Sequence, residues 1–215
     1  MTVTLYHYVH CPFCVRVRLT LGYLNIPYSS QVLRYDDELT PVQLTGKKML
    51  PILKTKEGPI NESLDIMALL DKENKLKISE KKLNDEFVLF ENFLNKIGNP
   101  IHSLAMPYWI YTPEFDEKSR AYFQTKKEIK RGPFKELVHR SEEFIAELNP
   151  LLDEIETKLN PYYMSQSLGL YDILLAAHLW GLYVVPEFQF SDKLHHYLQK
   201  IKKDCRFNYH QDFWS

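Results

Sequence analysis

Two cysteines three positions apart directly follow an alternating, strand-like run. The sequence is Cys11-Pro12-Phe13-Cys14, and the segment after it has the spacing of an amphipathic helix. Free N–H groups and the dipole at a helix N-terminus favour a thiolate over a thiol, and the thiolate is the nucleophile. We therefore predict a redox pair in which Cys11, at the turn, attacks a disulfide. Cys14, one helical turn further on, is expected to be more shielded and to resolve the product.

Two other interpretations of these cysteines are open. They are unreactive thiols beside a core helix, or they bind a metal together with His7 and His10. The strand–CPFC–helix context favours the redox pair, and a tetrahedral metal site usually draws on two separated pairs of ligands. We expect no bound metal, a His7 that is packed or at the surface, and a His10 that either modulates the Cys11 pKa or is simply solvated.

Two further short motifs suit a peptide-like ligand. Leu50-Pro51 opens a strand, where the proline can follow a cis bond and the Leu50 backbone can pair with an extended ligand. Ser63 is a good N-cap residue, the helix it begins can bind a carboxylate, and Glu62 can pair with an ammonium group. Taken alone, an edge-strand proline and a helix cap explain these motifs better.

The elements that must position these residues alternate between strand and helix over positions 1–72. The expected order begins with a strand over 2–8, a helix ending at 25–27, a strand over 28–33 and a polar connection over 36–44. A hairpin turning at 57–58 follows, and then a helix capped by Ser63 with Ile66, Leu69 and Leu70 facing inward. A CxxC at the first strand–helix junction of such an order is typical of a thioredoxin-like α/β domain. Gly22 is expected to weaken the first helix slightly.

The remainder of the chain has helical patterning. We predict a charged linker over 73–82 and an all-α domain over 83–215. The first expected apolar stripe runs from Leu83 to Ile97 and ends at Gly98-Asn99-Pro100. The second runs from Phe144 to Ile155, where Asn149-Pro150 makes it either one kinked helix or two short ones, and the third runs from Ile173 to Val184. These assignments predict two domains, an α/β thioredoxin-like domain over 1–72 and the helical one.

Composition excludes several classes of function. The 215 residues hold 27 Lys and Arg against 28 Asp and Glu, so no basic surface argues for nucleic acid. No run approaches the roughly 20 apolar residues of a membrane span, and the N-terminus lacks the pattern of a signal peptide. Three cysteines are too few for a disulfide framework, which favours a reducing, cytoplasmic compartment.

Together the motifs resemble a known family. The segments Leu5–Cys14, Leu50–Leu53 and Glu62–Ile66 resemble those of glutaredoxins. The helical second half makes the chain similar to the glutaredoxin 2 family, which is built like a glutathione S-transferase. The resemblance covers essentially the whole chain, but the helical half matches more loosely. There Gly169 stands where transferase-like proteins have a Ser or Thr cap three residues before Asp172, although Gly is an acceptable N-cap.

The resemblance implies a glutathione-dependent thiol–disulfide oxidoreductase, an enzyme of electron transport that acts on glutathionylated and other disulfide-containing proteins. It implies glutathione as co-substrate, no metal, and a monomer. The implied nucleophile is Cys11 and the resolving thiol is Cys14. The implied glutathione contacts are Pro12, Phe13, Leu50, a cis Pro51, Glu62 and Ser63, with Lys47 or Lys48 near the glycyl carboxylate.

Other functions stay open beside this one. A cysteine-type glutathione transferase or dehydroascorbate reductase would share the layout, but such proteins commonly lack the second cysteine. A non-enzymatic module like the chloride intracellular channel proteins would need a membrane-inserting run, and a dimer bridged by an iron–sulfur cluster is a further variant. We interpret Tyr108, Trp109 and Tyr111 as core or interdomain packing, with the lining of a substrate cleft as the less favoured alternative. We interpret Lys126, Lys127, Lys130 and Arg131 as a solvated face, and Cys205 as an ordinary free thiol.

Overall fold

A four-stranded mixed sheet forms the centre of the N-terminal half. The computed structural model describes residues 3–207. The strands are β1 (Val3–His7), β2 (Tyr28–Val32), β3 (Ile52–Lys54) and β4 (Pro59–Ile60), in the spatial order β2-β1-β3-β4. Strand β1 runs parallel to β2 and antiparallel to β3, so that Leu5 lies opposite both Ser30 and Leu53. This topology confirms the predicted thioredoxin-like arrangement.

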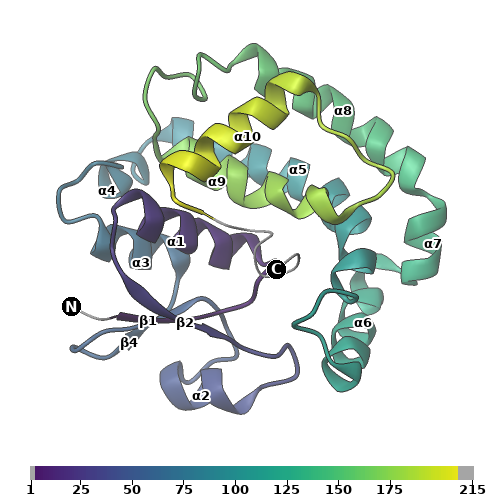
Figure 1. Cartoon of the computed structure of the whole chain (residues 1–215), viewed down its shortest axis with the longest axis horizontal. Coiled ribbons are helices and arrows are strands. Elements are labelled where there is room, and N and C mark those ends of the chain that lie inside the picture. The colour runs from purple at the N-terminus through teal and green to yellow at the C-terminus, as the bar shows by residue number, and fades with distance from the viewer. Residues whose placement is uncertain (1–2, 208–215) are drawn as a thin grey trace.

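Alternation along β1 decides which face of the sheet carries the core. Val3, Leu5 and His7 are buried, whereas Thr4 and Tyr6 are only half-buried, as the period of two predicts. Helices α1 (Pro12–Tyr23) and α3 (Ser63–Leu70) lie together on one side of the sheet, and α2 (Leu39–Thr45) lies on the other (Figure 1). The CPFC turn is therefore held between β1 and a helix that the domain core covers.

Two expectations for α3 were wrong. The helix begins at Ser63 itself, and Glu62 occupies the N-cap position with a left-handed φ of 69°. Ser63 is buried in the first turn and makes no capping hydrogen bond through its side chain. The inward face is formed by Ile66, Met67 and Leu70, whereas Leu69 is 47 % exposed because it falls on the opposite side of the helix.

The C-terminal half is a bundle of helices (Figure 1). Its elements are α4 (Ile78–Lys81), α5 (Asp85–Trp109), α6 (Glu117–Arg131), α7 (Phe134–His139), α8 (Ser141–Thr157), α9 (Leu170–Leu179), the short 3-10 helix η1 (Trp180–Val184) and α10 (Asp192–Asp204). Helix α4 lies inside the predicted linker, where Leu76 and Ile78 are buried. The division at 72 and 83 stays a prediction, but the segment between is packed rather than extended.

Pro100 does not end its helix, contrary to the prediction, whereas a single helix through Pro150 is one of the two forms that the sequence left open. Helix α5 continues through Gly98-Asn99-Pro100 and also contains Pro107, and α8 continues through Pro150. An internal proline costs about 3 kcal/mol of helix stability. Burial of the α5 face, which includes Ile97 and Ile101, outweighs that local preference. The α5 stripe starts at Phe87, because Leu83 precedes the helix and is 90 % exposed.

The two halves meet along α1, which packs on α9 and on the end of α10. A Cβ added to Gly22 would lie 1.7 Å from the carbonyl oxygen of Cys205. Gly22 is therefore required for this close approach, and its role goes beyond the expected weakening of the helix. The Asp172 carboxylate accepts from the Gly169 N–H at 2.8 Å, so Gly169 is the N-cap of α9 as expected. Within 3–207, no helix has the length and apolar character needed to cross a membrane.

Candidate active site

Backbone geometry places the Cys11 sulfur at the start of α1. Cys11 is the N-cap residue, and its carbonyl accepts the N–H groups of Cys14 and Val15, each at 2.9 Å. Pro12 stands at the first helical position, where its missing N–H removes no hydrogen bond. Cys11 is partly exposed and Cys14 is fully buried. Both thiols are thus positioned as their places in the CPFC motif predict.

The two thiols also differ in acidity. A hydrogen bond from the Cys14 thiol lowers the pKa of Cys11 to about 7, against the opposing effect of burial. The N–H groups of Cys14 and Phe13 and the charge of Arg16 act in the same direction as that hydrogen bond. Burial, and the hydrogen bond it donates, raise the pKa of Cys14 well above its usual value. Cys11 is therefore the thiol that ionises near neutral pH.

Leu50-Pro51 lies beside this pair, and its peptide bond is cis. Leu50 is buried and packs in one apolar cluster with Cys14 and Ile52. Leu50 also lines the same cavity as Cys11, whereas Pro51 does not line it. Leu50 therefore lies beside the CPFC motif, as the sequence predicts.

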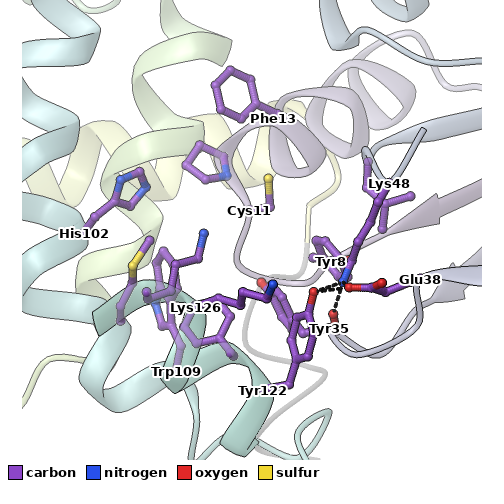
Figure 2. A pocket seen from close by; sticks show the side chains of 15 residues that line it. Tyr8, Cys11, Phe13, Tyr35, Glu38, Lys48, His102, Trp109, Tyr122 and Lys126 are labelled. Atoms are coloured by element: carbon purple, nitrogen blue, oxygen red, sulfur yellow. Dashed lines mark hydrogen bonds and ion pairs between the residues drawn. The ribbon is translucent and has the colours of Figure 1, made fainter. Parts of the chain in front are cut away.

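A cavity of about 540 Å³ opens next to Cys11, between the two halves of the chain (Figure 2). Its lining from the N-terminal half comprises Tyr8, Cys11, Pro12, Phe13, Tyr35, Glu38, Lys48 and Leu50. The lining from the helical half comprises His102, Met106, Trp109, Tyr122, Phe123, Lys126 and Lys127. The helical half therefore completes the site that the cysteines begin.

Lys48 forms hydrogen bonds to three residues at one rim of the cavity. Its ammonium group donates to the Tyr35 carbonyl at 2.9 Å, to Glu38 Oε1 at 3.3 Å and to Tyr122 Oη at 2.5 Å (Figure 2). The Tyr122 hydroxyl also donates to Glu38, and this hydrogen bond, followed by that of Lys48, lowers the Glu38 pKa. Of the two candidate lysines, Lys48 lines the cavity and Lys47 does not.

The Glu62-Ser63 pair does not line that cavity. Glu62 is exposed and Ser63 is buried at the first turn of α3. Within residues 3–207, neither side chain has a hydrogen bond or salt bridge. The structure brings Cys11, Pro12, Phe13 and Leu50 to one cavity and leaves Pro51, Glu62 and Ser63 outside its wall.

His10 is not the solvated histidine of one expected alternative, because it is buried. Its Nε2 atom lies 2.7 Å from Glu114 Oε1 and 2.8 Å from Thr112 Oγ1, and its ring stacks on Trp109 at 5.1 Å. His10 is therefore a contact between the CPFC turn and the helical half. The prediction of a solvated His10 was wrong because the sequence does not reveal which part of the chain covers the CPFC turn.

His7 is packed, one of the two expected possibilities. Its Nε2 lies 2.7 Å from Ser30 Oγ, and burial lowers its pKa to about 3, so it is neutral. No group of three or more His, Cys, Asp or Glu side chains could hold a metal ion in the described part of the chain.

The basic stretch on α6 is not simply the solvated face that the sequence suggested. Lys126 and Lys127 line the cavity, and Arg131 donates to the Asn99 carbonyl and to Ser103 Oγ, each at 3.1 Å. Only Lys130 of this group is exposed and away from both features. The sequence held one usable signal, since the lysines follow Tyr122 and Phe123 at the four-residue spacing of one helix face.

The aromatic cluster divides in the structure. Trp109 is buried and lines the cavity, Tyr108 donates to Glu187 at 2.7 Å, and Tyr111 is 70 % exposed. Cys205 is buried, and that burial raises its pKa, which fits the expected ordinary thiol.

Comparison with known proteins agrees with this architecture. The family model described as the C-terminal domain of glutaredoxin 2 matches residues 90–212, and the glutathione S-transferase N-terminal domain model matches residues 5–77. Glutaredoxin 2 of Escherichia coli K12 is 30% identical over 210 residues, which are 95% of this chain and 96% of that protein.

Solved structures show the same fold. Glutaredoxin 2 from Salmonella typhimurium, determined in complex with glutathione, superposes with a TM-score of 0.84 at 29% identity, covering 96% of this chain and 95% of that one. Glutathione transferase GSTFuA2 from Phanerochaete chrysosporium gives a TM-score of 0.77 at 16% identity, covering 97% and 100%, a likeness in fold alone. The matches to sequence and family model, which extend over both halves, establish that the chain belongs to the glutaredoxin 2 family.

Proposed function

We propose that this enzyme is a glutathione-dependent oxidoreductase that reduces mixed disulfides between glutathione and other thiols at Cys11. The observation that carries the proposal is the difference between the two thiols. Cys11 is partly exposed at a cavity with a pKa lowered to about 7, and Cys14 is buried behind it with a raised pKa. A low-pKa, accessible thiol attacks disulfides, and a shielded neighbour resolves them.

Glutathione would lie across the CPFC turn and the Leu50 backbone. The complex of the Salmonella glutaredoxin 2 with glutathione supports this ligand. Pro12 and Phe13 would flank its cysteinyl part, and the Leu50 backbone, beside the cis Pro51, would pair with it.

The two ends of the tripeptide would reach opposite sides of that backbone contact. The N-terminus of α3, with Ser63 in its first turn, would bind the γ-glutamyl carboxylate, and the exposed Glu62 would take the ammonium group. Lys48, which lines the cavity, is a better candidate than Lys47 for the glycyl carboxylate.

The reaction would proceed by two thiol–disulfide exchanges. The Cys11 thiolate attacks the glutathione sulfur of the mixed disulfide, a Cys11–glutathione disulfide forms, and the other thiol leaves as a thiolate that takes a proton from water. The thiolate of a second glutathione then attacks the glutathione sulfur on Cys11. Oxidised glutathione leaves, and the Cys11 thiolate is restored.

Disulfides within proteins would require Cys14 as well. Cys11 would attack such a disulfide and become linked to the substrate, and Cys14 would displace the substrate by forming the Cys11–Cys14 disulfide. Two glutathione molecules would then reduce that disulfide. We further propose that the enzyme acts as a monomer in the reducing cytoplasm, where free thiols persist.

The test is reduction of the mixed disulfide of glutathione and mercaptoethanol, coupled to glutathione reductase and NADPH. Cys11→Ser should abolish turnover, whereas Cys14→Ser should retain much of it because this reaction does not use the resolving thiol. Equal loss in both variants would refute the division of roles. Absence of turnover in the unsubstituted enzyme would refute the proposed function.

A second candidate is a cysteine-type glutathione transferase. It is favoured by the apolar wall that Met106, Trp109 and Phe123 give the cavity, which could accommodate an aromatic electrophile. Conjugation of glutathione to chlorodinitrobenzene, measured beside disulfide reduction, distinguishes the two. Conjugation that exceeds disulfide reduction would favour the transferase.

A further inference from the structure

Lys127 is an unusual residue in the wall of the cavity. It is half-buried on the helical side, opposite the CPFC turn, and has no hydrogen bond or salt bridge to any residue in 3–207. Its Nζ atom lies 5.4 Å from the centroid of the Phe123 ring. An ammonium group that loses water without gaining an anion is destabilised, which is why such groups are normally paired.

The charges around Lys127 do not offset the cost of burying its ammonium group. Burial and the cations Arg131 and Lys130 lower its pKa, and the negative charge opposing them is the Cys11 thiolate. Lys48 is already bonded to Glu38, and Tyr122 donates to the same carboxylate. His102, also on the cavity wall, is neutral because burial lowers its pKa to about 3.

Lys126 stands next to Lys127 at the exposed side of the cavity. It faces the space across from Cys11, near Tyr122 (Figure 2). Its Nζ lies 5.5 Å from the Tyr122 ring centroid, and its charge acts on Glu38 from beyond salt-bridge distance. The cavity therefore presents two ammonium groups on its helical side, and neither forms a salt bridge within residues 3–207.

We propose that Lys127, assisted by Lys126, is a specificity-determining site that binds a carboxylate on the non-glutathione half of the disulfide substrate. The inference rests on the proposed function, because it places glutathione along the CPFC turn and Leu50. The other half of the disulfide must then extend toward the helical wall, where α6 carries these two lysines. The preferred substrate is a mixed disulfide with a carboxylate a few bonds from the sulfur.

The chemistry of the first exchange makes this cation useful. When the Cys11 sulfur bonds to glutathione, Cys11 loses its negative charge, and the electron pair of the broken S–S bond goes to the leaving sulfur. The leaving half then carries both its carboxylate and a new thiolate. Ammonium groups on that side of the cavity favour this redistribution of charge.

The test compares three mixed disulfides of glutathione that differ in the charge of a small thiol: mercaptopropionate, mercaptoethanol and cysteamine. The wild-type kcat/KM should fall in that order, with about a tenfold range between the acidic and basic substrates. Lys127→Gln should bring the three values together by lowering that of the mercaptopropionate substrate. Lys127→Arg should retain the order, and rising salt should reduce the range.

Lys130→Gln is the matched control, since it removes a lysine from the same helix outside the cavity. It should leave all three kcat/KM values unchanged. Two glutathionylated peptides with Glu or Gln beside the modified cysteine distinguish the source of the carboxylate. A higher kcat/KM for the Glu peptide would show that the site also recognises acidic proteins. Equal kcat/KM values for the two peptides would limit its substrates to mixed disulfides of small acidic thiols.

Two results would overturn the inference while leaving the proposed function intact. One is a wild-type enzyme that turns over all three disulfides at equal kcat/KM. The other is a Lys127→Gln variant that loses activity equally on all three and shows a raised Cys11 pKa, because the lysine would then act only on the thiolate. A wild-type enzyme inactive on every disulfide would instead refute the proposed function.

Discussion

Replacing Cys14 tests why Cys11 is acidic. The largest cause of the lowered Cys11 pKa is the hydrogen bond from the Cys14 thiol, and two backbone N–H groups add to it. Cys14→Ala removes the donor, whereas Cys14→Ser replaces the thiol with a hydroxyl that can donate in the same place. We expect a raised Cys11 pKa in the Ala variant and a pKa that stays near 7 in the Ser variant.

The size of the shift follows from the hydrogen bond. A hydrogen bond to a charged group contributes about 1.5–3 kcal/mol, and one pKa unit corresponds to about 1.4 kcal/mol. Cys14→Ala should therefore raise the Cys11 pKa by about one to two units. From a pKa of about 7, half of Cys11 is thiolate at neutral pH, and the variant would retain roughly a tenth or less.

The assay is the rate of Cys11 alkylation by iodoacetamide as a function of pH, with the midpoint of the profile as the readout. The midpoint of the pH profile reports the acidity of Cys11 alone, whereas the absolute rate also depends on the nucleophilicity of its thiolate, which rises with pKa. Cys205 should not interfere, because it is buried and its pKa is raised. The reasoning would be wrong if the Ala and Ser variants had the same midpoint, or if Cys11 of the wild type did not ionise near pH 7.

Other predictions concern the packing that holds the site. Gly22→Ala should lower the free energy of unfolding by about 1–3 kcal/mol, because its Cβ would lie 1.7 Å from a backbone oxygen. Gly98→Ala, whose Cβ would be 3.5 Å from His178, should be neutral or stabilise by up to about 1 kcal/mol. Urea unfolding measures both, and equal effects would contradict the close-approach argument. Asp172→Ala leaves the Gly169 N–H, the Tyr163 N–H and the Tyr197 hydroxyl without their acceptor. It should cost about 3–5 kcal/mol in the same assay, and a loss below about 1 kcal/mol would show that other groups replace the carboxylate.

Features set by neighbouring residues could be predicted from the sequence. The position of Cys11 at a helix start, the burial of Cys14 and the alternation along β1 all depend on local spacing, and the structure has each of them. The cap at Gly169 followed from Asp172 three positions later. Local chemistry was sufficient in these places because tertiary packing reinforced it.

Features that depend on how the two halves meet were missed. His10 is buried against Glu114, and Lys127 lines the cavity, because α5 and α6 cover the CPFC turn. Nothing within a few positions of His10 indicates that contact, and the local signal for Lys127 is limited to its four-residue spacing from Phe123. Pro100 illustrates the same limit, since burial of the α5 face overrides a local signal for a helix end.

The most direct test of the account is the location of glutathione in a trapped intermediate. Cys14→Ser enzyme, treated with oxidised glutathione and examined by intact-mass and peptide-mapping mass spectrometry, should carry one glutathione per chain, bound to Cys11. Reduced glutathione should then remove it. A modification at Cys205, or no modification while the wild type reduces disulfides, would contradict Cys11 as the nucleophile.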